Sequence, residues 1–484
     1  MEGLTIKSCA IFNSALKSPK KKPSDDEAQD AKLLYYYPQN EELLVKRSNI
    51  GIIEGTLGFM NNFEKTNNNF LLTELNKFYF VANSYENDFT IVFILEKNSP
   101  MFSYYQSIET KKKWLKKILD NFYNMFSLFH HSLTKFFLSP ETPTIRIEIP
   151  QYKINKIEDF LLNFIEYFSQ MKLPFIENVI YFPLREQLQA NILLGVQRLN
   201  EKIPDMAMSA IIYKGHIIHN QLPLDSFSLL FNMFYSSFDF SAKYNNFKAP
   251  PEKVIHSISQ EENVANSKSD DTFYEEETNV SPFRKMFALG TSNNDYIIGI
   301  KKGNANNYNV FIPYVHIKQL DENYKMLVYY NNGMLIFILL DEKFNVPHRL
   351  STTLTKVEKW VTRYFNENID FLEQIYKVKM NQNDIVTYAY CNNANRSLKL
   401  SGAFFNKKNR TIDEVKFEVL QKAMVMNSEV SMTALTKFKG YYIYYINSCE
   451  RNVVMIYNDG LSLSQLKKNI DDNKSQLFEY IYMI

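Results

Sequence analysis

The sequence has few residues of the kinds that build disulfide frameworks or metal centres. Its three cysteines, Cys9, Cys391 and Cys449, are far apart and odd in number. They have neither the paired spacing of a zinc site nor the pattern of a disulfide-stabilised domain, so they favour a reducing compartment. Glu2 stands where a signal peptide has positive charge, and Lys7 interrupts the short apolar run that follows it. We therefore expect a protein that is not secreted.

Long apolar runs and catalytic motifs are also absent from the sequence. The most continuous apolar run, Met334 to Leu340, is far shorter than the roughly 20 residues that a membrane-spanning helix needs, and it predicts a buried strand. There is no phosphate-binding loop of the Gly-x-x-x-x-Gly-Lys-Ser/Thr type, no Gly-x-Ser-x-Gly elbow and no His-Glu-x-x-His zinc helix. We predict a soluble protein with no catalytic residues, no metal and no cofactor.

The chain also lacks an excess of charge of either sign, since 55 Lys and Arg stand against 53 Asp and Glu. This balance gives no reason to expect nucleic acid as a partner. Two local segments are basic, Lys17 to Lys22 and Lys111 to Lys117. Each suits contact with anionic lipid or with the acidic surface of a GTPase, and a solvated surface is the alternative. From the first segment we select Lys20, Lys21 and Lys22 as candidates for contact with a membrane or an acidic partner.

Glycine is scarce, with 13 in the chain, yet three glycines fall within one predicted helix near the N-terminus. Apolar side chains from Leu43 to Met60 recur at three- and four-residue spacing, which predicts an amphipathic helix. Gly51, Gly55 and Gly58 each weaken such a helix by up to roughly 1 kcal/mol relative to alanine. Either the segment forms a poor helix by chance, or another backbone approaches it closely.

Strand and helix patterns follow a similar order three times along the chain, although no close residue-level repeat is visible. The predicted strands cover 9–13, 32–38, 70–75, 77–83 and 89–95 in the first group, 178–182, 206–213, 217–221, 296–301, 309–313, 326–330 and 334–340 in the second, and 385–391, 397–400, 431–438, 440–447 and 452–458 in the third. The predicted helices cover 43–60, 110–129, 154–171, 184–202, 223–238, 350–376 and 411–426, with a closing helix within 461–484. The polar and acidic stretch from Lys248 to Asn279 is expected to be a disordered insertion.

Several short segments, taken in order across almost the whole chain, resemble the Ccz subunit of the Mon-Ccz complex, the vacuolar fusion protein family. They are Ile11-Phe12-Asn13, Lys32-Leu33-Leu34-Tyr35-Tyr36-Tyr37-Pro38, Asn49-x-Gly51-x-x-Glu54, Tyr181-Phe182-Pro183-Leu184, Tyr213 before the turn at Gly215, and Gly440 to Ile484. No single segment is specific, and the likeness lies in their order. The acidic insertion, the asparagine runs and the lysine-rich first loop depart from the family pattern and indicate a divergent member.

The resemblance implies an α+β protein of three longin domains, each a five-stranded, mainly antiparallel sheet flanked by helices. The element order described above fits that architecture. We expect a first longin domain over 1–173, a second over 174–380 with the acidic insertion at about 245–282, and a third over 381–484.

The resemblance also implies a function in which no bond is broken. Members of the family pair with a Mon-type longin subunit through their first longin domains, and the heterodimer opens a Rab GTPase of the late endosome or vacuole. We therefore expect a guanine-nucleotide exchange factor subunit, active only with its partner, cytoplasmic and recruited peripherally to late endosomal, lysosomal or vacuolar membrane. The alternatives are a longin adaptor or tethering scaffold, and a subunit of a related lysosome-related-organelle or ciliary longin complex.

By the same analogy, one side of the first long helix is the candidate surface for the partner or the GTPase. Gly51 and Gly55 are expected to allow close approach of another backbone, while Asn49 and Glu54 are expected to supply polar contacts. Simple packing of the helix against its own sheet is the alternative for the two glycines.

Overall fold

A computed structural model of the chain divides into two compact units. One unit contains the described residues of Met1–Lys172 and Val310–Tyr324, and the other contains those of Leu173–Ala249, Thr291–Asn309 and Lys325–Ile484. The structure describes residues 5–63, 70–86, 88–98, 108–138, 144–170, 181, 186–214, 216–236, 295–302, 308–331, 334–344, 353, 356–357, 359–365, 368, 370–374, 387–392, 397–401, 415–416, 419–420, 432–448 and 451–482. The predicted disordered insertion lies outside the described residues.

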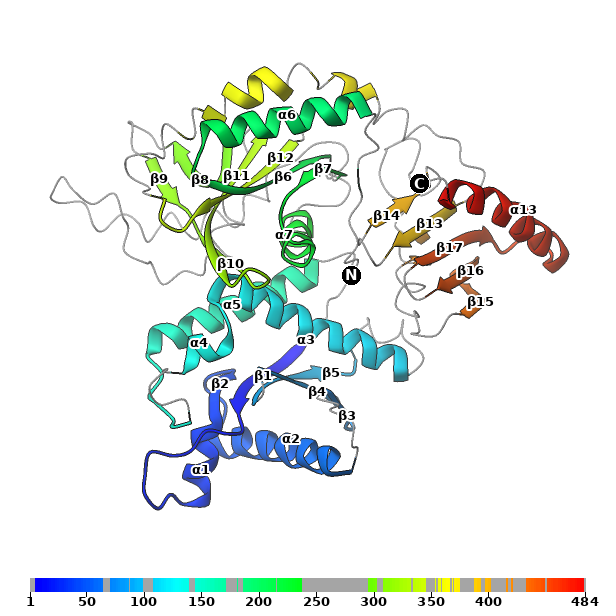
Figure 1. Ribbon diagram of the computed structural model, residues 1–484. Coiled ribbons are helices and arrows are strands. Elements are labelled where there is room, and N and C mark those ends of the chain that lie inside the picture. Colours follow the sequence, from blue (N-terminus) through cyan, green and yellow to red (C-terminus); the bar gives the residue numbers. More distant parts are fainter. Residues whose placement is uncertain are drawn as a thin grey trace. The chain divides into compact units, whose positions relative to one another are not determined.

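The first unit is built on a five-stranded antiparallel sheet (Figure 1). Its strands are β1 (Ile6–Asn13), β2 (Leu33–Tyr37), β3 (Phe70–Glu74), β4 (Phe78–Tyr85) and β5 (Phe89–Glu96). Their order across the sheet is β2-β1-β5-β4-β3, so the first strand lies in the interior beside the last. β5 reads Phe-Thr-Ile-Val-Phe-Ile-Leu and is buried on both faces over these residues, which requires helices on both sides of the sheet.

Helix α2 (Leu43–Phe63) covers one face of this sheet (Figure 1). Ile50, Ile53 and Leu57 recur at three- and four-residue spacing and pack in one core cluster with strand residues that include Phe12 and Phe80. This apolar contact holds the helix despite its glycines, because tertiary packing outweighs intrinsic helix propensity.

Helices α3 (Ile108–His130) and α5 (Gln151–Gln170) pack on the opposite face through aromatic side chains. The ring of Phe122 lies 5.2 Å from that of Phe93 on β5 and 5.2 Å from that of Phe160 on α5. The sheet is therefore sandwiched between one helix and two. Helix α3 begins at Ile108, two residues before the predicted start at Thr110.

Glu86, in the turn between β4 and β5, ties the sheet to the short helix α4 (Leu133–Phe137), which the sequence did not predict. Its carboxylate accepts hydrogen bonds from the Tyr123 hydroxyl at 2.9 Å, the Leu133 N–H at 2.7 Å, and the Thr134 N–H and hydroxyl at 2.8 and 2.7 Å. A carboxylate at this position satisfies N–H groups that have no partner within the helix.

The charged loop between the first two strands contains a helix, α1 (Asp25–Lys32), where an irregular loop was expected. Ser24 caps it, because its hydroxyl accepts from the Glu27 N–H while the Glu27 carboxylate accepts from the Ser24 N–H. Lys32 ends this helix and does not begin the strand. The Ser24 to Glu27 spacing was the available signal for the helix.

The second sheet has seven strands. They are β6 (Met206–Tyr213), β7 (His216–Asn220), β8 (Asp295–Lys302), β9 (Tyr308–Phe311), β10 (Tyr314–Ile317), β11 (Glu322–Asn331) and β12 (Met334–Asp341). The order is β7-β6-β12-β11-β8-β9, and β10 pairs with β11 outside this order. Helices α6 (Glu186–Lys202) and α7 (Leu224–Ser236) and a π-helical turn, η5 (Val361–Phe365), belong to the second unit. Of the helix predicted over 350–376, the structure describes residues 353, 356–357, 359–365, 368 and 370–374.

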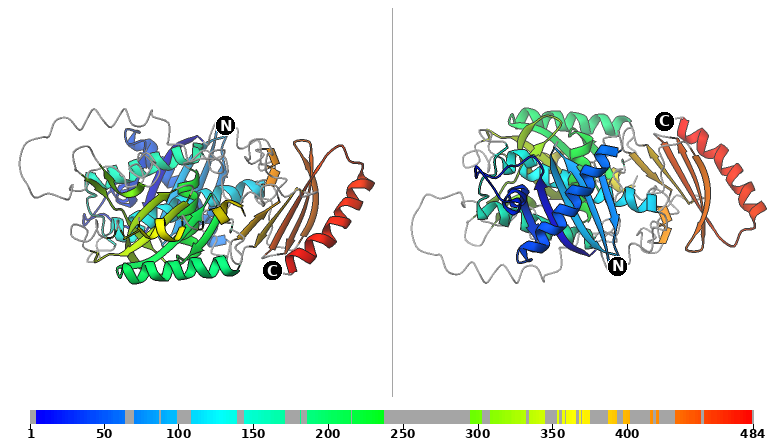
Figure 2. Two further views of the ribbon diagram at one scale, coloured as in Figure 1. Left: turned by 90° about the horizontal axis from the view of Figure 1, so that it is seen from above. Right: turned by 90° about the horizontal axis from the view of Figure 1, so that it is seen from below.

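The third sheet again has five antiparallel strands, in the order β14-β13-β17-β16-β15. They are β13 (Thr387–Asn392), β14 (Ser397–Leu400), β15 (Met432–Phe438), β16 (Tyr441–Ser448) and β17 (Arg451–Asn458). Helix α13 (Leu463–Tyr482) lies along one face of this sheet (Figure 2). Leu466 and Ile470 of the helix pack there in one cluster with Val453 and Met455. Of the helix predicted over 411–426, only a few residues are described.

All three sheets share one strand order. In each, the first strand of the group lies between the second and the last, and the remaining two continue outward from the last; in the second sheet β9 and β10 are additions to this core. The predicted α+β architecture of three longin-type sheets is confirmed. The domain boundaries at 173 and 380 stay a prediction.

Candidate interaction surface

Helix α2 presents apolar side chains to solvent on the face away from its sheet. Leu44 is 66% exposed, Ile52 51% and Phe59 63%. Ser48 and Gly55 stand between them, so the five positions follow one another at steps of four, four, three and four residues and form one row along the helix. We call Leu44, Ser48, Ile52, Gly55 and Phe59 the α2 stripe. Large side chains separated by small ones offer grooves into which a second helix or strand can pack.

Two glycines of α2 have no role in packing within the described fold. A Cβ built on Gly55 or on Gly58 would meet no atom within 4 Å. Gly51 differs, because a Cβ there would lie 2.8 Å from the side-chain amide nitrogen of Gln29 on α1. The close approach of Gln29, a residue of the same domain, therefore accounts for a glycine at position 51. No such neighbour accounts for Gly55, which lies in the exposed stripe.

The predicted polar contacts of α2 are made within the domain. The Asn49 amide donates to the Tyr36 hydroxyl of β2 at 2.8 Å. Glu54 forms an ion pair with Lys32 at the end of α1, and each side chain is a little over a quarter exposed. Both α2 residues are half-buried, and both have a partner in the folded domain.

Asn49, Gly51 and Glu54 do not share a face of the helix, contrary to the expectation from sequence. Residues two apart on a helix point in nearly opposite directions, so Asn49 and Gly51 lie on opposite flanks of the stripe. Gly51 and Glu54, three apart, lie together on the flank that α1 covers. Of the four residues predicted on α2, Gly55 alone belongs to the stripe; a partner or GTPase contact at any of them stays a prediction.

Arg47 is the centre of the contact between α1 and α2. Its guanidinium donates to the Asp30 carboxylate at 2.8 and 2.6 Å and to Asp26 at 2.7 Å. The bonded carboxylate of Asp30, and then that of Asp26, raises the pKa of Arg47. On the backbone, the Arg47 carbonyl accepts from the Gln29 amide at 2.8 Å. An acidic helix is thus held on one flank of α2 by charge and hydrogen bonds.

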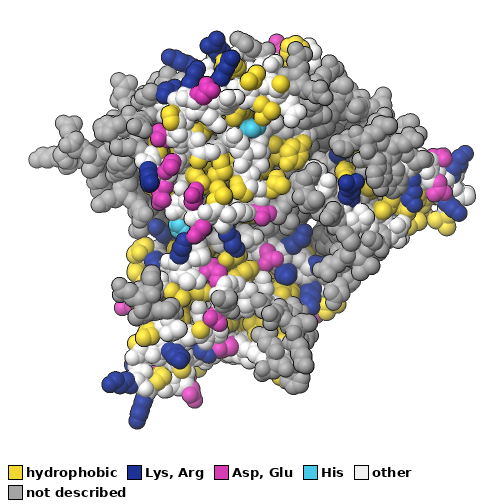
Figure 3. Space-filling model, viewed as in Figure 1, with side chains coloured by type: hydrophobic (Ala, Val, Ile, Leu, Met, Phe, Trp, Pro, Cys, Tyr) yellow, Lys and Arg dark blue, Asp and Glu magenta, His cyan; other side chains and the backbone are white. Residues whose placement is uncertain are grey.

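The lysines predicted to meet a membrane or an acidic partner lie in the exposed loop that leads into α1. Lys20 pairs with Glu27, and this bond lowers the pKa of that carboxyl. Lys21 and Lys22 are exposed and form no ion pair with any residue that the structure describes. Figure 3 shows basic side chains projecting at the lower left, where Figure 1 places this loop. Their proposed contact stays a prediction.

The sequence did not single out the most exposed part of this surface. The apolar spacing predicted one amphipathic helix and did not separate Leu44, Ile52 and Phe59 from the residues that face the sheet. The available signal was an excess of apolar residues, since Ile50, Ile53 and Leu57 already make a complete buried face. Apolar residues beyond such a face mark either a fully buried helix or an exposed interaction surface.

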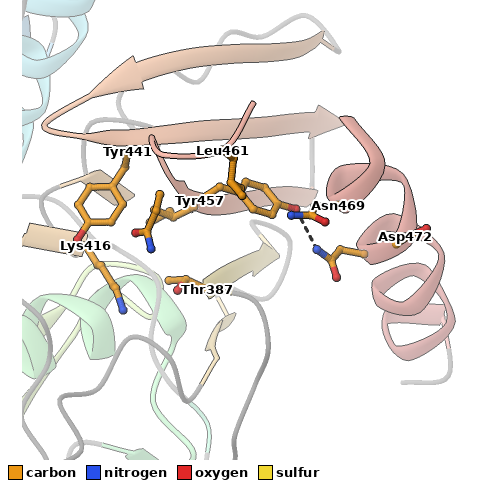
Figure 4. A pocket seen from close by; sticks show the side chains of 10 residues that line it. Thr387, Lys416, Tyr441, Tyr457, Leu461, Asn469 and Asp472 are labelled. Carbon is orange, nitrogen blue, oxygen red and sulfur yellow. Dashed lines mark hydrogen bonds between the residues drawn. The ribbon is translucent and has the colours of Figure 1, made fainter. Parts of the chain in front are cut away.

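The third sheet and α13 enclose an open hollow of about 450 Å³ with Thr387, Lys416 and Asn469 among its lining residues (Figure 4). Histidine and cysteine are missing from that lining, so it holds no nucleophile paired with a histidine base. In the described part of the chain no group of three His, Cys, Asp or Glu side chains is placed to hold a metal ion. No described helix is both long and apolar enough to cross a bilayer.

Comparison with known proteins identifies the domain that carries the α2 stripe. Residues 11–131 match the family model described as the first longin domain of INTU, CCZ1 and HPS4, and this range includes the whole of β2, α2 and α3. The chain is also similar to the vacuolar fusion protein CCZ1 homolog of Xenopus laevis, with 22% identity over 230 residues. That alignment covers 46% of this chain and 47% of the frog protein, so the chain matches about half the length of this relative. The resemblance predicted from the sequence is confirmed.

Proposed function

We propose that this chain, a longin-domain protein of the Ccz family, is one subunit of a heterodimeric guanine-nucleotide exchange factor. Its partner would be a Mon-type longin subunit, and its target a Rab GTPase of the late endosome or vacuole. The observation that carries the proposal is the α2 stripe, an exposed apolar row on the first longin domain. The name of the frog relative, a vacuolar fusion protein, supports the placement in endosome–vacuole traffic.

The stripe suits a protein partner because three large apolar side chains are exposed in one row along the helix. Leu44, Ile52 and Phe59 are each more than half exposed, and each would bury most of its surface against a second longin domain. Burying a large aliphatic or aromatic side chain yields about 1.5–3 kcal/mol relative to leaving it in water. Aromatic and aliphatic anchors of this kind carry much of the binding energy of protein interfaces.

Nucleotide exchange requires no catalytic group, and surface shape suffices for it. A complex that binds the GTPase most tightly in a nucleotide-poor conformation weakens nucleotide binding by the same factor by which nucleotide weakens the complex. The composite surface of two longin domains would supply that preference. A protein of this kind acts as a regulatory subunit, and it breaks no bond in its substrate.

The lysine loop offers a second contact of the same complex. Lys21 and Lys22 are exposed in the loop that leads into α1, and Lys20 in the same loop forms an ion pair with Glu27. Near an anionic membrane each lysine contributes about 1 kcal/mol of attraction. Contact of this loop with anionic lipid would hold the complex peripherally on an endosomal, lysosomal or vacuolar membrane from the cytoplasmic side.

One observation favours a different function, that of a longin adaptor or tethering scaffold. Asn49 and Glu54, the polar residues expected to meet the GTPase, are bonded to Tyr36 and Lys32 of the same domain. A scaffold needs the apolar stripe for assembly and does not need those polar groups. The two functions differ in whether nucleotide release is accelerated.

The experiment that separates these functions is fluorescent nucleotide release from the late-endosomal Rab of the same organism. The chain alone, the Mon-type subunit alone and the co-purified pair are compared, and we expect acceleration from the pair only. Ile52→Asp should abolish pairing and acceleration, whereas Ile147→Asp, at a site 44% exposed and remote in sequence from α2, should leave both unchanged. A stable pair that leaves release at its intrinsic rate would favour the scaffold.

A further inference from the structure

Helix α1 is joined to the rest of the first domain mainly through polar contacts. It lies in the segment between β1 and β2 and reads Asp-Asp-Glu-Ala-Gln-Asp-Ala-Lys. Ala31 is the one buried residue of this helix. The polar bonds between α1 and α2 are those of Asp26 and Asp30 to Arg47, of Gln29 to the Arg47 carbonyl, and of Lys32 to Glu54.

An element held in this way separates readily from its neighbour. An eight-residue helix is too short to be stable alone in water, and its capping box lowers the cost only in part. Ion pairs that are partly exposed contribute little each and weaken with salt. Few buried apolar contacts and exposed hydrogen bonds are the features of segments that open locally while the remaining domain stays folded.

The flank that α1 covers is continuous with the α2 stripe. Arg47, Gly51 and Glu54 lie about one turn apart along that flank. Glu54 is next in sequence to Gly55, which belongs to the stripe, so the flank and the stripe adjoin. The Gln29 amide occupies the space over Gly51, which is open because glycine has no side chain. While α1 is in place, it occupies the flank beside the stripe, so a second backbone that docks there is kept away from Gly51.

We propose that α1 is a detachable clamp that covers the Arg47–Glu54 flank of α2 and limits docking on the stripe. This inference rests on the proposed function, because the protein that docks is the Mon-type subunit. Detachment would uncover Gly51 for close backbone approach and release Arg47 and Glu54 for polar contacts with the partner. The apolar row and the polar flank would then form one surface.

The test uses the full chain and changes α1 only, so that the α2 surface stays intact. Asp26→Asn with Asp30→Asn removes both carboxylates that hold Arg47 and keeps the shapes of the side chains. Asp25→Asn is the matched control, since Asp25 is exposed in the same first turn and pairs with no described residue. We expect backbone amide exchange over residues 26–32 to rise about tenfold in the double variant and to change little in the control. Equal exchange in the wild type and the double variant would overturn the clamp.

Association with the Mon-type subunit then tests whether the clamp limits docking. We expect the double variant to associate several-fold faster than the wild-type chain, and the control to match the wild type. Equal or slower association of the double variant would overturn the proposed limit on docking. Failure of the wild-type chain itself to bind the subunit would refute the proposed function, and the amide exchange would still report whether α1 detaches.

Discussion

Replacement of Gly55 by alanine is expected to stabilise the protein and at the same time to weaken its assembly. Gly55 lies eight residues before the end of α2 and is exposed, and a Cβ at this position would meet no atom within 4 Å. The substitution therefore adds no clash in the free chain. Alanine in a helix interior is favoured over glycine by about 0.5–1 kcal/mol, because the unfolded glycine has more freedom to lose.

The stability part of this prediction is measured by thermal unfolding of the full chain. For a unit of roughly 200 residues, 1 kcal/mol corresponds to a shift of about 2–4 °C in Tm. We expect Gly55→Ala to raise the Tm of the transition of the first unit by about 1–4 °C. Gly58→Ala is the matched control, since its added Cβ also meets nothing and should give a similar gain.

The binding part depends on the place of Gly55 on the helix. Gly55 belongs to the stripe, whereas Gly58 lies about 60° from it, in one row with Arg47, Gly51 and Glu54, so Gly58→Ala is a control for stability only. If a partner backbone closes on Gly55, the new methyl group forces it away at a cost of about 1–3 kcal/mol, which weakens binding by roughly 5- to 150-fold. The control for binding is Ile147→Ala, at a site that is exposed and remote in sequence from α2, and this variant should bind the Mon-type subunit as the wild type does. Unchanged binding of Gly55→Ala, or equal losses in both variants, would refute the assignment of the stripe as the docking surface.

Three further outcomes follow from the first domain. Ile52→Asp should leave the free energy of unfolding within about 0.5 kcal/mol, because the side chain is 51% exposed, while pairing measured by co-purification is lost. Glu86→Gln should lower the free energy of unfolding in urea by about 1.5–3 kcal/mol, since four donors lose a charged acceptor; an unchanged midpoint would contradict this. Burial lowers the pKa of His130 to about 3, below the roughly 6.5 of an unfolded chain. The unfolded state therefore binds the extra proton first, and stability is lost as the pH falls below about 6.5. In His130→Phe, the midpoint of urea unfolding should change less between pH 7 and pH 5 than it does in the wild type.

Periodicity in the sequence was sufficient to predict most elements of the fold. β12 was predicted over 334–340 and ends one residue later, and the hairpin of β16 and β17 lies within a residue or two of its predicted bounds. Strands buried on both faces and helices with one apolar face leave patterns that are local in sequence. Short elements held by specific contacts do not, which is why α1, α4 and β10 were missed.

The candidate surface was harder to predict than the fold, for a physical reason. A sequence shows that Gly51 and Gly55 are unusual in a helix, but it does not show which atoms approach them. In the structure the space over Gly51 is filled by Gln29 of the same domain, while the space over Gly55 is open. Contacts between residues far apart in sequence decide between the two cases, and they depend on the position of α1.

The bond between Lys32 and Glu54 also decides how the polar flank has to be tested. Charge reversal at Glu54 places a positive charge beside Lys32, so it repels the end of α1 as well as changing any contact with a partner. Lost activity would not separate the two causes. Lys32→Gln removes the same ion pair from the α1 side and leaves Glu54 in place. If Glu54 contacts the GTPase, Glu54→Gln should slow nucleotide release and Lys32→Gln should not; if the pair only holds α1, the two variants should behave alike.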